Sequence, residues 1–599
     1  MELKLRKLLI PPFNYTELFK NLKLITNEVS KIKKNKKIKK IAILGGSSTS
    51  HLKDLLNIFL SDKNISANFY EGQFQLYYEE VLFNVGKLKE FNPDILWIHT
   101  TWRNIKKFPG MDFSSSQINT LIESEFEHYK SIWEYAKKNF SCLVIQNNFD
   151  FPNYRVLGNK DSIDAHGKIN FISELNRKFN KYDTQNDWFN VLDINYLSFL
   201  KGSQEWQSER DWYKFRYSPS VISSVDIAYS VSRVILALEG LSYKCLILDL
   251  DNTIWGGVIG DDGVEKIKLS RDNPTGDAYL DFQKYILELK NRGIILAVVS
   301  KNEDKIAKLG LDHKNSYLNI KDFSAFVANW NTKSSNIKEI IKKINISETS
   351  AIFVDDNKME RDEVNQNTNI YVPDIGDNIE NFRNIIEKHN FFETTKVTSE
   401  DLKRPESIRL SIESSKTIEN FNNYRDYLKS LNMKAEIKKV DSASKERFIQ
   451  LINKTNQFNL TLEKINSNDI SSLNADEKTL ALTGSLTDKF SEHGIVSAIY
   501  GKVRKNNEMD IKIWVMSCRV FKRTLEYAVF YKFFNLCREL KIKKINGYYN
   551  KSDRNIIVKD LYNELGFQKI KKTPNSSEWS LDMASNLDFI NNMIQMNYE

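Results

Sequence analysis

Cysteine is scarce in this 599-residue sequence, and the few cysteines lie far apart. Only four are present, Cys142, Cys245, Cys518 and Cys537, and no two of them form a CxxC pair. A disulfide framework and a cysteine-based zinc site are therefore not expected. Each thiol is either a core residue or a single nucleophile.

Long apolar runs are absent as well. No stretch of about 18 consecutive apolar residues occurs, so the sequence predicts no transmembrane helix. The opening residues, MELKLRKLLIPPF, mix charges into a short apolar run, which is not the pattern of a signal peptide. We therefore expect a cytoplasmic protein.

Strong charge patterning is also lacking. The net charge of +9 comes from lysines in short dispersed clusters such as KNKKIKK (34–40), without interleaved aromatic residues. This pattern is typical of solvated surface rather than of a nucleic-acid track. The apolar content of 41% is ordinary, and the length suggests about three domains.

Alternating strand-like and helical patterns divide the chain into three predicted domains of an α/β protein. Residues 1–240 open with the strand KIAILGGSSTS and continue through alternating strands and helices. Residues 241–391 contain the strands IILAVVSKN and AIFVDDN with a helix between them, which predicts a parallel sheet. The polar segment FETTKVTSEDLKRPES leads into residues 392–599, where strands precede a long helix from Leu525 to Leu540.

The stretch LILDLDNTIWGG (246–257) places two aspartates at the end of an apolar run. Asp249 and Asp251 are two residues apart, so in an extended chain their side chains leave the same face. A solvated loop would explain one aspartate but not a pair arranged in this way. The pair suggests a cation site.

Each predicted strand of the second domain ends on an oxygen-bearing side chain. Asp249, Ser300 and the pair Asp355 and Asp356 come directly after LIL, AVV and IFV. Ligands of open α/β sheets gather at the carboxyl ends of the strands, so these groups are expected to converge. Lys333, at the start of the helix before the last strand, is suited to hold a phosphate oxygen.

Carboxylates gathered this closely repel one another and need a cation. Mg²⁺ takes oxygen ligands and usually keeps substrate phosphate in its coordination shell. We therefore predict a Mg²⁺ site with ligands drawn from Asp249, Asp251, Asp355 and Asp356.

These motifs carry a resemblance to a known family. DLDNT matches the DxDxT motif of the haloacid dehalogenase (HAD) phosphatase superfamily, and Ser300, Lys333 and the DD pair follow in that family's order and approximate spacing. Four longer segments resemble the FkbH-like proteins (HAD subfamily IIIC), whose members prepare glyceryl units for acyl carrier proteins. The segments are DLDNTIWGGVIGDDG (249–263), VVSKN (298–302), FVDDNKMER (353–361) and KTNQFNLT (454–461).

The HAD resemblance implies a role for each motif residue. Asp249 would be the nucleophile that attacks a phosphoryl group, and Asp251 the acid and base. Asp355 would complete the Mg²⁺ site. A carboxylate attacks phosphorus only when a cation and a lysine have neutralised the phosphate oxygens. The expected substrate-binding residues of this domain are Thr253, Ser300, Asn302 and Lys333.

The third predicted domain resembles the GNAT acyltransferase fold, which FkbH-like proteins join to the phosphatase. The resemblance is carried by DKFSEHGIVSAI (488–499), SCRVFKRTLE (517–526) and NKSDRNIIVKDLYNELGF (550–567). The loop that binds the pyrophosphate of acetyl-CoA needs glycine, so that backbone N–H groups approach the phosphates. Here Lys522, Arg523 and Thr524 occupy that loop, which argues against the use of acetyl-CoA.

Cys518 is the candidate acyl carrier of this domain. It follows the strand DIKIWVMSC, and its neighbour Arg519 is a cation of the kind that favours a thiolate. The alternative is a small buried residue in a strand. Cys245 is the rival thiol, but it lies inside the KCLIL strand and is expected in the core.

Further polar residues of the third domain are candidates for substrate binding. His493, in SEHG, is either a base for thioester formation or the cap of a turn. The amides of KTNQFNLT either donate to an acyl oxygen or a phosphate, or stabilise a turn. The predicted substrate-binding residues of this domain are Asn456, Gln457, Asn459, His493 and Arg519.

The first domain resembles SGNH hydrolases in its opening motif, within a predicted flavodoxin-like sheet. GGSST (45–49) places Ser47 where these esterases carry their nucleophile. The closing DxxH motif is missing, since DWYKFRYSP stands near the domain's end and no histidine occurs between His166 and His313. A serine without a base is a poor nucleophile. We expect a non-catalytic, docking or substrate-shaping role.

The combined resemblance implies an enzyme that dephosphorylates 1,3-bisphosphoglycerate and loads a glyceryl unit onto the phosphopantetheine thiol of an acyl carrier protein. One alternative is a phosphatase of a small phosphorylated metabolite in surface-glycan biosynthesis, with GNAT-like acylation of a precursor. The other is a scaffold without enzymatic activity that docks biosynthetic partners.

Overall fold

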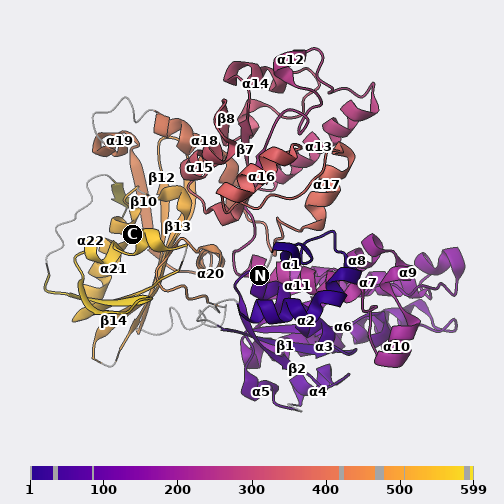
Figure 1. Ribbon diagram of the computed structural model, residues 1–599. Helices are drawn as coiled ribbons and strands as arrows, with labels where there is room; N and C mark the ends of the chain where they lie inside the picture. The colour runs from indigo at the N-terminus through magenta and orange to yellow at the C-terminus, as the bar shows by residue number, and fades with distance from the viewer. Residues whose placement is uncertain are drawn as a thin grey trace. The chain divides into compact units, whose positions relative to one another are not determined.

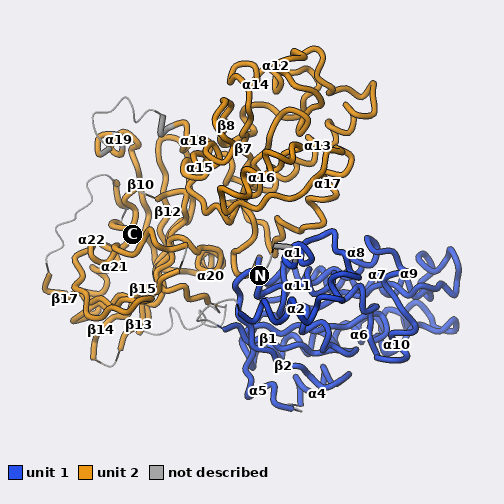
Figure 2. The backbone as a smooth tube through the Cα atoms, in the orientation of Figure 1, with its two compact units in different colours: residues 1–236 blue, residues 237–599 orange. Residues whose placement is uncertain are grey.

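Two compact units make up the chain, Met1–Leu236 and Ala237–Glu599, coloured blue and orange in Figure 2. Both contain helices and strands, which confirms the predicted α/β class. Among the described residues no helix combines the length and the apolar character needed to cross a membrane. The computed structural model describes residues 3–31, 38–83, 86–416, 424–465, 478–504, 506–521, 523–552, 554–585 and 594–597.

The first unit is built on a five-stranded parallel sheet with the order β2-β1-β3-β4-β5 (Figure 1). This is the flavodoxin-like order, in agreement with the predicted fold class. The strands are β1 Ile38–Gly45, β2 Ser66–Glu71, β3 Ile95–His99, β4 Leu143–Asn147 and β5 Phe189–Leu192.

Amphipathic helices accompany this sheet. The longest, α6 (Ser115–Phe140), begins where Ser114 forms a capping box with Gln117, and it buries Ile118, Tyr129 and Trp133 on one face. The others are α1 Leu3–Lys7, α2 Tyr15–Ser30, α3 Ser50–Asp62, α4 Tyr77–Leu82, α5 Leu88–Phe91, α7 Lys168–Gln185, α8 Ile194–Lys201, α9 Ser203–Trp206, α10 Glu209–Phe215 and α11 Ser223–Leu238.

The second unit contains two separate sheets. The first is parallel, with the order β8-β7-β6-β9, and its strands are β6 Cys245–Leu248, β7 Ile295–Ser300, β8 Ala325–Ala328 and β9 Ala351–Val354. Every residue of β6, β7 and β9 is buried, as expected of strands covered on both faces. The parallel sheet predicted from the sequence is confirmed, although β8 was not among the predicted strands.

Helices connect and cover these four strands. They are α12 Ile259–Asp262, α13 Pro274–Asn291, α14 Asp304–Leu311, α15 Lys333–Ile344, α16 Lys358–Asn367 and α17 Ile379–Lys388. The predicted helix KSSNIKEIIKKI coincides with α15, whose first turn is capped by the side chain of Thr332. The cap places Lys333 at the first helical position.

A further helix, α18 (Ser399–Lys416), occupies part of the segment that was treated as a polar linker in the sequence. It contains Pro405, yet it packs Ile408 and Ile412 into the same apolar cluster as strands β6, β7 and β9. The burial of these isoleucines explains why a helix forms despite the proline.

The second sheet of this unit is mixed and has nine strands (Figure 1). Its order is β16-β17-β15-β14-β13-β12-β10-β18, and β11 pairs with β14. Strands β14 and β15 run parallel but pair only at Glu508–Asp510, so the rest of β14 is free of β15. The bounds are β10 Met433–Lys439, β11 Phe458–Asn459, β12 Thr479–Thr487, β13 Glu492–Val503, β14 Glu508–Met516, β15 Lys544–Asn550, β16 Gln568–Lys572, β17 Ser576–Asp582 and β18 Ile594–Asn597.

The predicted long helix of this region is α21 (Leu525–Glu539), which buries three phenylalanines against the sheet. The shorter helices are α19 Tyr424–Ser430, α20 Lys445–Lys454 and α22 Leu561–Glu564. Strands and helix thus follow in the predicted succession.

Candidate active site

Three carboxylates meet at the carboxyl ends of β6 and β9. Asp249 follows β6, and Asp355 and Asp356 follow β9, its parallel neighbour. One carboxylate oxygen from each of the three lies within 4.8 Å of the others. This geometry fits a single metal ion with oxygen ligands.

Lys333 lies between two of these carboxylates. Its Nζ is 3.1 Å from Oδ1 of Asp249 and 2.5 Å from Oδ2 of Asp355, and the side chain is buried. Burial alone lowers the pKa of Lys333, but the two carboxylates outweigh it and the pKa is raised. The lysine is therefore a fixed positive charge at the site.

Burial and mutual repulsion make the charged form of these three carboxylates less favourable than it is in water. Burial raises the pKa of Asp249, and the charge of Asp355 raises it further, while Lys333 opposes both. Burial likewise raises the pKa of Asp355 and of Asp356. One lysine does not compensate three crowded acids, so the site favours a second cation.

Asp251 was predicted among the metal ligands, but its carboxylate lies outside this group. Its Oδ1 accepts hydrogen bonds from Nε1 of Trp255 (2.9 Å) and from the backbone N–H of Ile259 (3.0 Å). Its Oδ2 accepts one from Nδ2 of Asn302 (2.7 Å). The strand ends at Leu248, so the alternation of faces that underlay the prediction does not extend to Asp251.

The other predicted residues of this domain also converge here. Asn302 donates from the same Nδ2 to Oγ of Ser300, at 3.2 Å, and so joins Ser300 to Asp251. Thr253 is buried, and its hydroxyl donates to Oδ1 of Asp356 and accepts from the Asp356 N–H, both at 3.3 Å. The structure thus brings the predicted phosphate-holding residues to one place.

Two buried residues support this site without having been assigned a role from the sequence. Arg361 donates from Nη1 to the backbone carbonyls of Asp355 (2.9 Å) and Asp356 (2.6 Å), which holds the turn after β9. Trp255 orients Asp251. Both lie inside motifs quoted above, FVDDNKMER and DLDNTIWGG, so their position in the motif was the available signal.

Cys518 lies elsewhere in the same unit. It begins a short 3₁₀ helix after β14 and lines a cavity of about 100 Å³ together with Arg519, Asn456 and Gln457. Cys518 is partly exposed, whereas the other three cysteines are buried. Burial raises the pKa of the Cys245 thiol, in line with its predicted place in the core.

Asn459 does not line this cavity. Its Oδ1 accepts from the N–H of Leu462 at 2.8 Å, and its Nδ2 donates to the carbonyl of Thr455 at 3.1 Å. The side chain is fully buried and stabilises its own turn. Of the two roles left open for these amides, Asn459 has the structural one.

His493 also lies away from the cavity, in a buried network. Its Nε2 is 2.8 Å from Oδ2 of Asp488, and its Nδ1 is 3.2 Å from Oγ of Ser407. Burial lowers the pKa of His493 to about 4, so the ring is neutral at physiological pH. Arg523, one of the residues that occupy the position of the acetyl-CoA pyrophosphate loop, forms an ion pair with the same Asp488. Lys522 of that loop lies outside the described residues.

The carboxylate site around Asp249 and the cavity lined by Cys518 lie at opposite ends of the strands of the parallel sheet. Lys244 and Ile295, at the starts of β6 and β7, line the cavity with Cys518. Asp249 and Ser300 stand at the ends of the same strands. Asp249 is five positions after Lys244 along an extended segment, a span of roughly 16 Å. Motif order gave no sign of this separation.

Ser47 of the first unit is buried at the end of β1. Its hydroxyl donates to the carbonyl of Ser218 at 3.3 Å. His99, from the end of β3, donates from Nε2 to that carbonyl (2.8 Å) and accepts from Nδ2 of Asn147 at Nδ1 (2.8 Å). Burial lowers the pKa of His99 to about 4. Both ring nitrogens are occupied, so this nearby histidine has no free atom for the serine proton.

The comparisons with known proteins found no matching family model and no matching curated protein. Among solved structures, the GNAT-family acetyltransferase from Staphylococcus aureus is 16% identical and covers 25% of this chain and 99% of its own, with a TM-score of 0.20. The ribosomal-protein-S18-alanine N-acetyltransferase from Escherichia coli is 11% identical and covers 26% of this chain and 98% of its own, with a TM-score of 0.21.

One similarity extends over a larger part of the chain. The N-terminal part of the protein BF1531 from Bacteroides fragilis contains a phosphatase domain, and its structure was solved in complex with Mg. It is 26% identical, covers 63% of this chain and 99% of its own, and has a TM-score of 0.58. The chain is therefore similar, over most of its length, to a protein that contains a phosphatase domain.

Proposed function

We propose that this protein is a Mg²⁺-dependent phosphatase of the HAD type. The observation that carries the proposal is the group Asp249, Asp355 and Asp356, with the buried ammonium of Lys333 between two of them. The similarity to the magnesium-bound BF1531 fragment supports it. Mg²⁺ held by the three carboxylates would neutralise the oxygens of a bound phosphate.

The residues then divide the reaction between them. A carboxylate oxygen of Asp249 attacks phosphorus, the bond from phosphorus to the substrate oxygen breaks, and a phosphoaspartate forms. Lys333 stabilises the charge that develops on the phosphate oxygens. Water then hydrolyses the phosphoaspartate. Asp251, held in place by Trp255 and Asn302, protonates the leaving oxygen in the first step and takes the proton of the water in the second.

We further propose the FkbH-like substrate and product. The phosphatase would act on 1,3-bisphosphoglycerate, and the mixed-sheet region would load the glyceryl group onto the phosphopantetheine thiol of an acyl carrier protein. Cys518 would carry the group as a thioester. Its partial exposure and its place in a cavity beside Arg519, Asn456 and Gln457 support this role.

Phosphate release tests the phosphatase. The full-length protein should release phosphate from 1,3-bisphosphoglycerate that is generated in situ in the assay. Chelation of Mg²⁺ should abolish this release. A protein that releases no phosphate under any metal condition would be a scaffold rather than an enzyme.

Mass spectrometry tests the transfer. Wild-type protein given 1,3-bisphosphoglycerate without carrier should gain the mass of one glyceryl group, removable by hydroxylamine, and Cys518→Ala should gain none. Added acyl carrier protein should then take up the group. Phosphate release without any mass increase on the carrier would identify a plain phosphatase of a small metabolite.

A further inference from the structure

The cavity that Cys518 lines is built from both sheets of the second unit. Lys244 and Ile295 come from the starts of β6 and β7, whereas Cys518 follows β14 of the mixed sheet. Further lining residues come from α18, from α20 and from the segment after β15. The basic ones are Lys244, Arg404, Arg447, Lys454, Arg519 and Arg554. The place of the thiol in this cavity therefore depends on contacts between the two sheets and not on β14 alone.

One such contact joins Cys518 to the end of α15. Nδ2 of Asn345 donates a hydrogen bond to the backbone carbonyl of Cys518 at 3.2 Å. The same carbonyl accepts the N–H of Phe521 at 3.3 Å, which closes the short 3₁₀ helix Cys518–Val520. A carbonyl oxygen has two lone pairs, so it accepts both bonds together. Asn345 thus holds the turn that carries the thiol.

Asn345 is itself held in one conformation. It ends α15 in the left-handed region, with φ 59° and ψ 50°, and its N–H donates to the carbonyl of Ile341 at 2.9 Å. Asparagine adopts this conformation more readily than most residues other than glycine. The helix is anchored in the core of the parallel sheet by four buried isoleucines, Ile337, Ile340, Ile341 and Ile344. The amide that contacts Cys518 is therefore presented from a rigid element.

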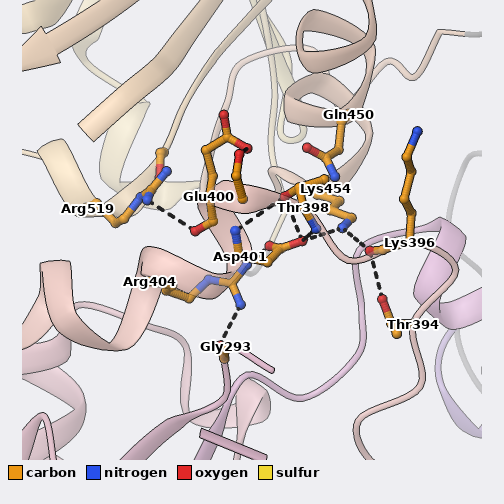
Figure 3. A network of polar contacts seen from close by, with 12 residues as sticks. Gly293, Thr394, Lys396, Thr398, Glu400, Asp401, Arg404, Gln450, Lys454 and Arg519 are labelled. Atoms are coloured by element: carbon orange, nitrogen blue, oxygen red, sulfur yellow. Dashed lines mark hydrogen bonds and ion pairs between the residues drawn. The ribbon is translucent and has the colours of Figure 1, made fainter. Parts of the chain in front are cut away.

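A second contact joins the Cys518 segment to α18 (Figure 3). Arg519, the next residue along the chain, donates from Nη1 to the backbone carbonyl of Glu400 at 3.5 Å. Its Nε also donates to Oγ of Ser517 at 3.3 Å, so the guanidinium spans the start of the turn. The thiol segment therefore contacts two helices, α15 and α18, and both pack on the parallel sheet.

The start of α18 has a fixed place against that sheet. Asp401 pairs with Arg404, and its Oδ2 is 3.1 Å from Nζ of Lys454 on α20. Arg404 also donates from Nη1 to the carbonyl of Gly293, just before β7, at 3.1 Å. A Cβ at Gly293 would collide with the carbonyl oxygen of Asp401, so this close approach requires glycine. The carbonyl of Glu400 is fixed together with its helix.

We propose that Asn345 is a positioning residue for Cys518, which holds the thiol segment in the orientation that its reaction needs. The proposal rests on the proposed role of Cys518 as acyl carrier. The helix that ends at Asn345 begins at Lys333 of the carboxylate site, so one element of 12 residues, about 18 Å long, contributes a side chain to each site. On this proposal α15 serves both reactions, one at each of its ends.

Alkylation of the Mg²⁺-loaded full-length protein by iodoacetamide, with peptide mapping of all four cysteines, tests the assignment. Asn345→Gly keeps the left-handed helix end but removes the donor, so the Cys518 segment should be released. We expect the alkylation rate of Cys518 to rise at least threefold, while the three buried cysteines keep their wild-type rates. Glyceryl loading of Cys518 should fall about tenfold, because the thiol is no longer held in one orientation.

Two further variants separate positioning from helix termination. Asn345→Asp keeps the shape of the side chain and its tolerance of the left-handed conformation, but an ionised carboxylate cannot donate to a carbonyl. Its effect on Cys518 should therefore equal or exceed that of Asn345→Gly. Asn92→Gly, at the exposed left-handed end of α5, is the matched control and should leave the alkylation of Cys518 unchanged.

The proposal is overturned if Cys518 is alkylated at the wild-type rate in either Asn345 variant. It is also overturned if all four thiols react faster together, since that pattern reports a loss of stability alone. Failure of the proposed function would look different. Wild-type Cys518 would then take up no glyceryl group, while its alkylation rate would still differ between wild type and Asn345→Gly.

Discussion

The ends of two parallel sheets in this protein differ in how their polar groups are satisfied. At the end of β1 in the first unit, Ser47 and His99 share the carbonyl of Ser218, and burial keeps the histidine neutral. At the end of β6 in the second unit, charged carboxylates crowd around Lys333. Similar topology thus supports a closed hydrogen-bond network in one place and an unbalanced charge cluster in the other.

The difference shows where chemistry is to be expected. Groups that satisfy one another have little free energy to gain from a ligand, whereas crowded acids bind a cation favourably, and a bound cation can in turn attract a phosphate. The topology of a sheet positions its strand ends in both units. The charge balance at those ends is what distinguishes the site that we propose to be reactive from the one that we expect to be structural.

The largest expected effect comes from a substitution in the carboxylate site. Asp249→Asn removes the nucleophile and one metal ligand, so phosphate release should fall by at least about a thousandfold. The melting temperature without metal should not fall, because one fewer buried charge relieves repulsion. Turnover near that of wild type would contradict the assignment of Asp249.

Lys333→Met should have the next largest effect. It leaves Asp249 and Asp355 buried without their cation, which typically costs about 3 kcal/mol of stability and also removes the phosphate contact. Thermal unfolding should shift downward without metal and recover partly with Mg²⁺. Lys338→Met, at an exposed position of the same helix, is the control, and an equal shift in both variants would show that the charge pair contributes nothing.

His99→Gln tests the closed network through pH. The pKa of His99 is lowered in the folded protein, so between about pH 6.5 and 4 the unfolded state binds the proton and stability is lost as pH falls. Between pH 7 and pH 5 this loss is about 2 kcal/mol for a pKa near 4. The glutamine variant should lack that part of the loss. Hydrogen exchange of peptides from β1 and β3 in the full chain, measured in urea at both pH values, would reveal it.

Ser47→Ala should have the smallest effect. Phosphate release should stay within twofold of wild type, and the lost hydrogen bond to Ser218 should cost about 1 kcal/mol. The comparison between the two sheet ends would fail if wild-type protein hydrolysed a simple ester and Ser47→Ala did not. Such a result would identify the first unit as a working esterase.

Much of the parallel sheet in the second unit could be read from the sequence. Apolar runs located β6, β7 and β9, and the helical period located α15 with Lys333 at its start. Strand β8 was missed although it is as long as β6 and β9, and it differs from them in that its two central residues are only partly buried. Helix α18 was missed because Pro405 and a polar surface obscured it. Both are recognisable only through what they pack against.

The convergence of Asp249, Ser300 and Asp355 was determined by sequence alone, because parallel neighbouring strands necessarily bring their carboxyl ends together. The cavity around Cys518 was decided only by tertiary structure. Its cations come from segments far apart in the sequence, and no motif contains more than one or two of them. A lysine in isolation is interpreted as solvated surface. Packing of α18 and α20 around the start of β6 converts these scattered charges into one positive cavity, since burial strengthens their mutual repulsion.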